Sequence, residues 1–289
     1  MSISQPYTGL SRYFRRLAWS IRKRLTPNNF VIIPFDQDMS LCVRPIDRLG
    51  KRVRLNGYSD PELATLLDTY LTPGMTYFDV GAHFGQFVLM AGKRVGNTGA
   101  VHAFEPTKGT FAQLKTSVSY NNLPWIKINH NAVADKAGEL NLNVCATGKG
   151  EFNSIGAPMR AAQDVDHIET ITAITLDDYC EEHNISHIDI MKIDVEGAEL
   201  AVLQGGKKIF SADNGPDIVC EFNEVTAENM GYSAADLYNQ FVNYGYQLFR
   251  YDRITGELHN EPANQVYDET VNIVASKNVS RIRERLHLS

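Results

Sequence analysis

The apolar positions of this chain change period along its length, and this change predicts the order of its elements. Five apolar runs of six to ten residues predict buried strands at 75–80, 100–106, 125–134, 187–195 and 216–222. Between these runs, apolar residues recur every three or four positions, which is the period of an amphipathic helix. This alternation predicts a doubly wound α/β fold with a mainly parallel sheet. Two further strands, 246–251 and 270–275, are expected to complete the sheet.

Residues 1–70 follow a different pattern, and we expect them to form an N-terminal extension of this domain. Apolar stretches at 30–35 and 39–44 flank a short turn and predict a β-hairpin. Asp60 followed by Pro61 marks the start of a helix, because Asp caps a helix and Pro suits its first position. The extension therefore leads by a helix into the α/β domain.

The first helix of this extension, residues 10–25, combines an apolar stripe with high positive charge. The stripe consists of apolar residues three or four positions apart, namely Leu10, Phe14, Leu17, Ile21 and Leu25. Such a helix can lie on a membrane surface that carries anionic lipid. It can also pack on its own domain or on a partner subunit, which is the commoner use of an apolar stripe. We expect packing and keep peripheral membrane contact as the alternative.

The α/β domain is expected at 71–277, and the basic residues 278–289 form a tail to which the sequence assigns no role. Within the domain, residues 139–176 show no helical period, so we expect extra strands and a loop there. Loops of this kind carry substrate contacts on a rigid scaffold. The polar and flexible side chains expected to reach a substrate are Asn153, Ser154 and Met159.

The charge of the chain is unevenly distributed. Its formal net charge is −6, but residues 1–25 carry six basic residues and no acid, so the remainder carries −12. An acidic body repels phosphate backbones, which argues against nucleic acid as the main substrate. We therefore expect a small-molecule or glycan partner rather than DNA or RNA.

Cysteine spacing and hydropathy indicate the cellular compartment in which the protein is expected. The four cysteines lie more than 30 residues apart, so no zinc-type pair exists and reduced thiols are expected. No apolar run is long enough to span a bilayer, and no apolar h-region follows the basic N-terminal segment. These features predict a cytoplasmic protein, with membrane association through the first helix as the open alternative.

Ligands of a doubly wound sheet bind beyond the carboxyl ends of its strands, so the residues after each strand are candidates. The first strand ends in Asp79, and Gly81 and Gly85 flank the turn that follows. Ala82 and His83 fill the spacing between these glycines, so the loop lacks the GxGxxG pattern. A carboxylate there repels a diphosphate but attracts a cation such as the amino group of S-adenosylmethionine. The loop therefore favours this cofactor, but a carboxylate at Glu105 suits NAD as well, so only the two features together discriminate between the cofactors.

The second and third strand ends offer groups for the rest of that cofactor. Glu105 lies 20 residues beyond Gly85, where a carboxylate accepts both ribose hydroxyls, and Pro106 follows it. The alternative is that Glu105 merely caps the next helix. Asn131 and Ala132 end the third strand, where an adenine would lie, although Asn is also a common turn residue.

The fourth and fifth strands end in acidic residues. Asp194 is expected at a strand tip that faces the cleft, and Glu196 opens the next helix, where its charge complements the helix dipole. Glu221 ends the fifth strand, and capping or a solvated loop is an equally good account of it. We expect Asp194 to contact the cofactor as well as the substrate.

The chain resembles the FkbM-type family of S-adenosylmethionine-dependent methyltransferases in four segments, YFDVGAHFGQFVLMAG, VHAFEPTKGTFAQLK, TLDDY and KIDVEGAELAVLQGG. The resemblance spans about residues 58–222. It implies a seven-stranded methyltransferase (Rossmann-like) sheet, S-adenosylmethionine as cofactor, and O-methylation of a hydroxyl of a sugar, glycolipid or secondary metabolite. His83 stands where the family usually has Asn, so the resemblance transfers no role to that side chain.

A hydroxyl acceptor gains from a general base, which typically contributes about 10²–10⁴-fold in rate. The candidates, in falling order of preference, are Asp194, Glu196, Glu221 and His83. No resident metal is expected. A metal-assisted variant, in which the three carboxylates hold a divalent ion through oxygen, is the alternative.

Two other classes of function compete with this prediction. A nicotinamide-dependent oxidoreductase needs a phosphate-binding glycine loop, and Asp79 and the missing GxGxxG argue against it. A non-catalytic scaffold that keeps only the fold predicts degraded cofactor residues, yet Asp79, Gly81, Gly85 and Glu105 are all present.

Overall fold

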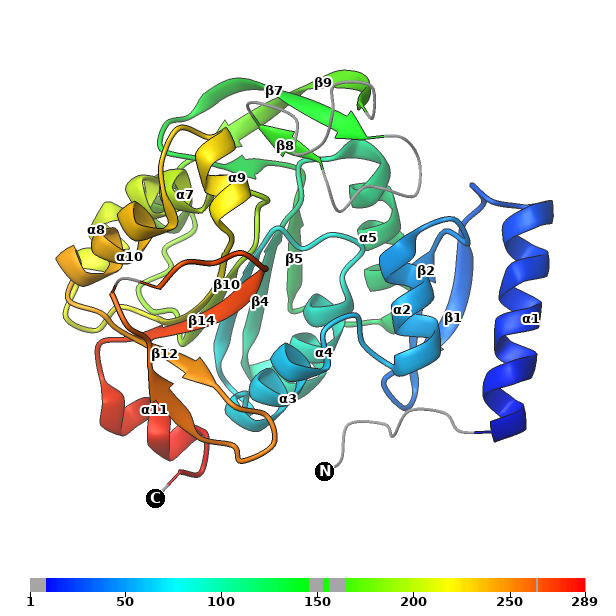
Figure 1. Ribbon diagram of the computed structural model, residues 1–289, viewed down its shortest axis with the longest axis horizontal. Coiled ribbons are helices and arrows are strands. Elements are labelled where there is room, and N and C mark those ends of the chain that lie inside the picture. Colours follow the sequence, from blue (N-terminus) through cyan, green and yellow to red (C-terminus); the bar gives the residue numbers. More distant parts are fainter. Residues whose placement is uncertain (1–8, 146–152, 156–164, 264, 289) are drawn as a thin grey trace.

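The computed structural model describes residues 9–145, 153–155, 165–263 and 265–288. Its centre is an eight-stranded sheet with the strand order β13-β12-β14-β11-β10-β3-β4-β5 (Figure 1). In that order the strands are Leu258–Asn260, Gln247–Tyr251, Val271–Ser276, Asp217–Phe222, Ile190–Ile193, Thr76–Val80, Ala100–Phe104 and Ile126–Asn129. Six of the seven predicted strands are confirmed as single strands of this sheet, the seventh is present only in part as β5, and β13 adds an eighth strand at the edge.

The sheet is mixed, but five neighbouring strands in it are parallel. From β5 through β4, β3 and β10 to β11 every pairing is parallel, whereas β14 lies antiparallel to β11 and to β12. The chain first builds outward from β3 to β5 and then returns to place β10 on the other side of β3. The strand order therefore reverses between β3 and β10, and this reversal is where a doubly wound sheet opens a crevice for a ligand. The predicted fold class is confirmed.

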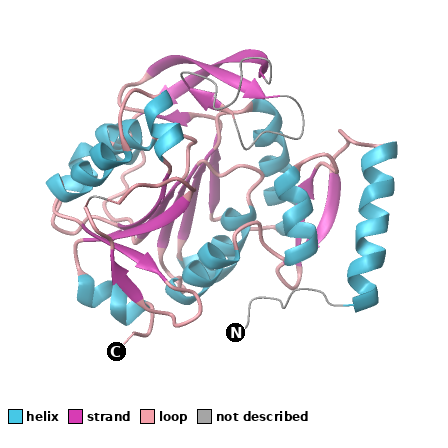
Figure 2. Ribbon diagram, viewed as in Figure 1, coloured by secondary structure: helices cyan, strands magenta, loops and turns pink. Residues whose placement is uncertain are grey.

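Helices cover both faces of this sheet (Figures 1 and 2). One face carries α3 Pro61–Tyr70, α4 Gln86–Val95, α5 Lys108–Asn121 and α11 Val279–Arg285. The other carries α6 Leu176–Glu182, α7 Glu199–Gly205, α8 Lys207–Ser211 and α10 Ala234–Asn243. Side chains of β3 alternate between these layers, with Tyr77 in the first core and Phe78 in the second, because successive residues of a strand point to opposite faces.

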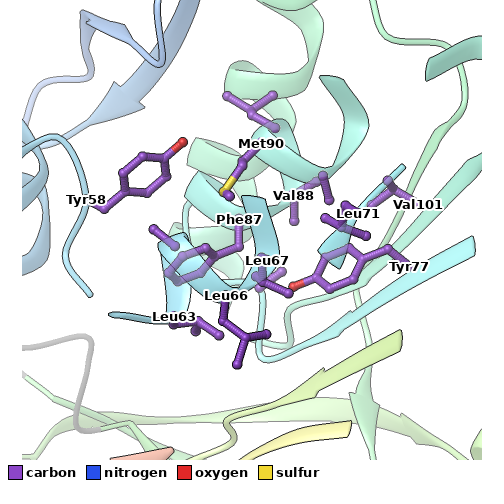
Figure 3. Packing of buried hydrophobic residues seen from close by; sticks show 14 of the residues in the cluster. Tyr58, Leu63, Leu66, Leu67, Leu71, Tyr77, Phe87, Val88, Met90 and Val101 are labelled. Atoms are coloured by element: carbon purple, nitrogen blue, oxygen red, sulfur yellow. The ribbon is translucent and has the colours of Figure 1, made fainter. Parts of the chain in front are cut away.

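The first of these cores joins the helices α3 and α4 to the sheet. Leu63, Leu66 and Leu67 of α3 pack beside Phe87 of α4 and the ring of Tyr77 (Figure 3). The helix α3 begins where the sequence predicts, because Asp60 Oδ1 accepts hydrogen bonds from the backbone N–H groups of residues 62 and 63, both at 3.0 Å. This cap fixes the segment that leads into the ligand crevice.

The N-terminal extension shares this core. Its elements are α1 Gly9–Leu25, β1 Val31–Phe35, β2 Met39–Val43 and α2 Arg48–Asn56. The predicted hairpin is confirmed by the antiparallel pairing of β1 with β2, and Ile33, Phe35 and Leu41 are buried in the core cluster of α3 and α4. Arg94 of α4 forms ion pairs with Asp36 in the hairpin turn and with Asp68 of α3. The extension is thus packed against the α/β domain.

A second, four-stranded sheet lies over the carboxyl ends of the central strands. Its order is β6-β9-β7-β8, formed by Ala132–Val133, Val165–Ile174, Gly138–Cys145 and Ser154–Ile155. The extra strands expected within 139–176 are therefore present. The single strand predicted at 125–134 was wrong: β5 joins the central sheet and β6 joins the second one. An apolar run does not reveal that its two ends pair with different sheets.

The C-terminal tail is a helix with a structural function. Ile282 of α11 and Leu286 after it are buried, and the Arg281 guanidinium lies 2.7 Å from the buried carboxylate of Asp217 on β11. Asp217 also accepts hydrogen bonds from the hydroxyls of Tyr70 and Ser276, at 2.7 and 2.6 Å. The tail therefore fastens to the end of the sheet opposite the ligand crevice. A further short helix, α9 Glu224–Asn229, follows β11.

Candidate functional site

A cavity of about 540 Å³ opens at the carboxyl ends of the central strands, where the strand order reverses. Four parts of the fold line it: the loops after β3, β4 and β10, the second sheet, the helices α2 and α3, and the ends of β11 and β14. The predicted site residues that line it are Gly81, Ala82, His83, Glu105, Pro106, Asn131, Ala132, Asp194, Glu196 and Glu221. This strand-end cavity therefore brings together most of the residues selected from the sequence.

The loop between β3 and α4 requires glycine for packing reasons. Gly81 has φ +85°, and a Cβ placed there would lie 1.8 Å from the carbonyl oxygen of Asp194. Gly85 has φ +93°, and its Cβ would lie 2.5 Å from a side-chain carbon of Leu114. The sequence explained these glycines by close approach to a ligand. The structure shows that they let the loop after β10 and the helix α5 approach, and Gly85 is not among the lining residues described.

Glu105 is buried at the end of β4 with its carboxylate at the cavity wall. Its Oε2 accepts from the backbone N–H of His83 at 3.0 Å, and its Oε1 accepts from that of Thr107 at 2.9 Å. Glu105 thus fixes the β3–α4 loop and also the start of α5, which the capping alternative anticipated. A carboxylate accepts at about four sites, so these two hydrogen bonds and a further one with the Thr107 side chain still leave it able to accept from a hydroxyl in the cavity. Burial raises the pKa of Glu105 to about 7 although these hydrogen bonds oppose the shift.

Three charged side chains, Asp79, Lys192 and Asp194, contact one another beside the cavity. Lys192 of β10 is buried, and its ammonium lies 3.3 Å from Asp79, 3.1 Å from Asp194 and 3.2 Å from the carbonyl oxygen of Gly81. Burial alone would lower the pKa of Lys192, but the two carboxylates raise it above its ordinary value, so the side chain is charged. Asp79 is 1% exposed and lies behind the lining residues, whereas Lys192 and Asp194 line the cavity. Direct contact between Asp79 and a ligand therefore stays a prediction.

Three carboxylates converge at the tips of β10 and β11. One oxygen from each of Asp194, Glu196 and Glu221 lies within 4.8 Å of the others. Burial, followed by repulsion from Asp194 and Glu196, raises the pKa of Glu221 well above its ordinary value. Asp194 has the Lys192 ammonium beside it at 3.1 Å.

The loop that carries this carboxylate cluster is held in an uncommon conformation. Glu196 has φ +56°, in the left-handed region that non-glycine residues rarely adopt. Buried Glu199 supports the loop, because its Oε1 accepts from the backbone N–H groups of Val195 and Gly197 at 3.0 and 3.2 Å. The Tyr232 hydroxyl donates to its other oxygen at 3.1 Å. Backbone strain of this kind is common at functional sites.

His83 contributes a neutral imidazole to the wall. Both of its ring nitrogens are buried, and neither forms a hydrogen bond within the described part of the chain. Burial lowers the pKa of His83 to about 4, so the ring carries no charge at pH 7. A group with this pKa is a poor proton acceptor near neutral pH.

A family model described as "Methyltransferase FkbM domain" matches residues 79–248 of the chain. This range holds the loops after β3, β4, β10 and β11 and therefore most of the strand-end cavity. The chain belongs to the FkbM methyltransferase family. S-adenosylmethionine is the cofactor of this family, as the resemblance implied.

Known relatives of this FkbM-family chain include the "31-O-demethyl-FK506 methyltransferase FkbM" of Streptomyces tacrolimicus. The two are 33% identical over 161 residues, which is 47% of this chain and 60% of that protein, so the chain spans less than two thirds of its relative. Among solved structures, the "Methyltransferase FkbM" of Methylobacillus flagellatus is 14% identical, with a TM-score of 0.45, and the match covers 72% of this chain and 48% of that one. Fibrillarin of Aeropyrum pernix is 11% identical, with a TM-score of 0.39 and a coverage of 74% and 73%.

The residues around the cavity fit the family's cofactor. Glu105 offers free lone pairs at the place expected for ribose hydroxyls, and Asn131 and Ala132 line the wall beside it. Lys192 and Asp194 supply one cation and one anion, which match the carboxylate and the amino group of an amino acid. A volume of about 540 Å³ is within the range of cofactor sites, roughly 300–1,000 Å³.

Several lining residues escaped prediction. Lys192 lies inside an apolar run and was interpreted only as part of a strand. A lysine within an apolar strand that ends in an acid was the signal that could have identified it as a site residue. Arg48 and Arg52 line the cavity from α2, a helix that the sequence did not predict, and Thr270 and Asn272 line it from the β14 end. Of the predicted substrate contacts, Asn153 lines the cavity, Ser154 is buried, and Met159 lies outside the described residues.

Cofactor affinity is expected to depend on pH through Glu105. With a pKa of about 7, its carboxylate takes up a proton as the pH falls below 7 and then accepts hydroxyl hydrogen bonds less well. Calorimetric titration with S-adenosylhomocysteine should therefore show about tenfold weaker binding at about pH 6 than at about pH 8. The variant Glu105→Gln should bind weakly at both pH values. An equal pH dependence in this variant would assign the effect to another group.

Proposed function

We propose that the protein transfers the methyl group of S-adenosylmethionine to a hydroxyl oxygen of a sugar, glycolipid or secondary metabolite. The observation that carries the proposal is the convergence of the three strand-tip carboxylates on the cavity that Glu105 also lines. A cluster of carboxylates beside a cofactor site suits removal of a proton from a neutral hydroxyl. The Streptomyces relative is a methyltransferase of an O-demethyl compound, and this supports an oxygen acceptor.

In this proposal five parts of the cavity wall contact different parts of the cofactor. Glu105 accepts the ribose hydroxyls, Asn131 and Ala132 lie against the adenine, and the backbone at Gly81 and Ala82 passes the amino-acid part. Asp194 meets the amino group and Lys192 the carboxylate, because they are an anion and a cation that lie side by side in the cavity wall next to Gly81. Asp79 acts through Lys192, whose ammonium it holds 3.3 Å away.

Proton removal is assigned to Glu221. Its raised pKa gives it the proton affinity that a base needs near neutral pH, whereas Asp194 is neutralised by Lys192 and His83 is too weakly basic. Bound S-adenosylmethionine would supply a methyl group on a sulfonium, a leaving group that needs no further activation. The residues of the chain therefore orient the acceptor hydroxyl and take its proton, and orientation alone is worth on the order of 7–11 kcal/mol.

The test is transfer of label from methyl-labelled S-adenosylmethionine to panels of sugars, glycolipids and polyketide hydroxyls. We expect label in an alkali-stable ether on one class of acceptor, lost in the variant Glu105→Gln at limiting cofactor. The same assay in EDTA addresses the metal-assisted alternative. Unchanged activity is expected, and a loss that Mg²⁺ restores would assign an ion to the carboxylate cluster. Labelled nitrogen or carbon products would contradict the oxygen acceptor.

We further propose that the protein works at the cytoplasmic face of a membrane, on which α1 lies. Four apolar side chains of α1 are exposed: Phe14 by 59%, Leu17 by 47%, Ile21 by 49% and Leu25 by 75%. Trp19, on the opposite face, is 4% exposed and is the residue that packs on the domain. These four side chains therefore do not pack on the domain, so of the two forms of packing that we expected only packing on a partner subunit stays a prediction, and Leu10 lies outside the described side chains. At 100° per residue Arg22 and Arg24 flank the stripe on either side, as on helices that bind anionic lipid.

Flotation with vesicles tests this attachment. Within the part of the chain that the structure describes, no helix is long and apolar enough to cross a bilayer. The protein should float with phosphatidylserine vesicles and not with neutral ones, and Leu17→Ser with Ile21→Ser should abolish flotation. The matched control, Ile254→Ser with Val266→Ser, removes two exposed apolar side chains elsewhere and should float normally. A dimer that the α1 variant converts to monomers would assign the stripe to a second copy instead.

A further inference from the structure

The helix α2 presents a positively charged wall to the strand-end cavity. Arg48 and Arg52 lie one helical turn apart, both are exposed, and both line the cavity. The helix also carries Lys51 and Arg54 and contains no acidic residue. This charge contrasts with the net charge of −6 for the chain and with the carboxylates on the far side of the same cavity. The cavity is thus lined by cations on the α2 side and by anions at the strand tips.

The position of α2 is fixed by its packing. Asp47, the residue before the helix, is buried and accepts hydrogen bonds from the Arg44 backbone N–H at 3.2 Å and from the Gln113 amide at 3.0 Å. At Gly50 an added Cβ would lie 3.1 Å from the Cβ of Val43, so helix and hairpin are in close contact. Arg48 and Arg52 therefore project from a rigid element, and a charged ligand would meet them already oriented.

The N-terminal extension and the central sheet meet at the cavity. Asn272 of β14 donates a hydrogen bond from its amide to Asp60 Oδ2 at 2.7 Å, and both residues line the cavity. Asp60 caps α3, which follows α2 in the chain. Arg48 and Arg52 of α2 therefore line the same cavity as Glu221, the residue to which proton removal is assigned.

We propose that Arg48 and Arg52 bind an anionic group, a phosphate or a carboxylate, of the acceptor whose hydroxyl is methylated. The inference rests on the proposed function and adds the chemical class of the acceptor to it. A guanidinium pairs with two oxygens of a phosphate or carboxylate at once, so two arginines one turn apart both bind and orient such a group. The proposed function assigns the cofactor's carboxylate to Lys192, so the two arginines remain for the acceptor.

Inorganic pyrophosphate and glucuronate serve as probes, titrated into the protein saturated with S-adenosylhomocysteine. We expect one or both to bind, and Arg48→Gln and Arg52→Gln each to weaken that binding about tenfold. Lys51→Gln is the matched control, because it removes the same charge from the same helix at a residue outside the described lining of the cavity. Pyrophosphate binding alone indicates a phosphorylated acceptor, and glucuronate binding alone an acidic sugar.

Three results would overturn the proposal. The first is that neither probe binds at millimolar concentration. The second is that Lys51→Gln weakens probe binding as much as the two arginine variants do. The third is that the arginine variants weaken binding of S-adenosylhomocysteine instead, which would assign the arginines to the cofactor carboxylate. The titration needs no methyl transfer, so it separates this inference from the proposed function. Probe binding that depends on the arginines, in a protein that labels no hydroxyl, would contradict the proposed function alone.

Discussion

Replacing Glu221 by Gln is expected to lower kcat by about 10²–10⁴-fold, the typical contribution of a general base. The amide keeps the shape of the side chain but cannot take up the acceptor's proton. The affinity for S-adenosylhomocysteine should stay within about twofold, since Glu221 is assigned no cofactor contact. Steady-state kinetics and calorimetry on the same preparation measure both. Glu228→Gln removes an exposed carboxylate from the adjacent helix α9 and should leave kcat unchanged.

The pH profile separates a base from a merely structural residue. Glu221 acts only when ionised, and burial and its neighbours raise its pKa. The rate of the wild type should therefore rise with pH as this carboxyl group loses its proton and fall as it is protonated. Glu221→Gln should lack this limb of the profile. A variant that keeps the limb at reduced rate would show that another group, with Asp194, Glu196 and His83 the candidates, accepts the proton.

Replacing Gly81 by Ala is expected to cost about 2–5 kcal/mol of stability and to abolish cofactor binding. A left-handed φ costs an alanine about 1–2 kcal/mol, and overpacking adds about 1–3 kcal/mol. The new Cβ would lie 1.8 Å from the carbonyl oxygen of Asp194, so the loop that holds the carboxylate cluster has to move. Thermal unfolding and calorimetry with S-adenosylhomocysteine measure the two effects.

Gly231 supplies the control for this substitution. Its φ is +83°, close to the +85° of Gly81, but no described atom lies within 4 Å of an added Cβ. Gly231→Ala should therefore cost only the backbone strain and leave cofactor affinity unchanged. If the two variants lose the same stability and both bind cofactor normally, the close packing of the β3 and β10 loops has no part in the site.

Much of the site was readable from the sequence because strand ends are local features. Glu105 follows an apolar run directly, so its position at a strand tip needed only the recognition of that strand. The same holds for Asp194 and Glu221, and the parallel order then brings all three to one edge of the sheet. The acid at position 79 was also placed at the correct strand end, but its burial depends on Lys192 from a neighbouring strand. Pairing of that kind is long-range and leaves no local pattern.

The helix α2, in contrast, could not be predicted from the local sequence. Its nine residues include four basic ones and Gly50, so propensity and apolar period give little sign of a helix. Packing of Gly50 against Val43 of β2 and the hydrogen bond from Gln113 of α5 to the buried Asp47 hold it in place instead, and both contacts are tertiary. The break between β5 and β6 is similar, because only the position of a second sheet separates the two strands. The second sheet above the cavity and the arginines that line it from α2 could therefore be recognised only in the structure.

The most direct test of the site is a crystal structure of the protein with S-adenosylhomocysteine. The account places Glu105 within hydrogen-bond distance of both ribose hydroxyls, the amino group against Asp194, and the sulfur toward the carboxylates of Glu196 and Glu221. A cofactor bound away from Glu105, or a diphosphate nucleotide that occupies the same crevice in preference to it, would contradict the account.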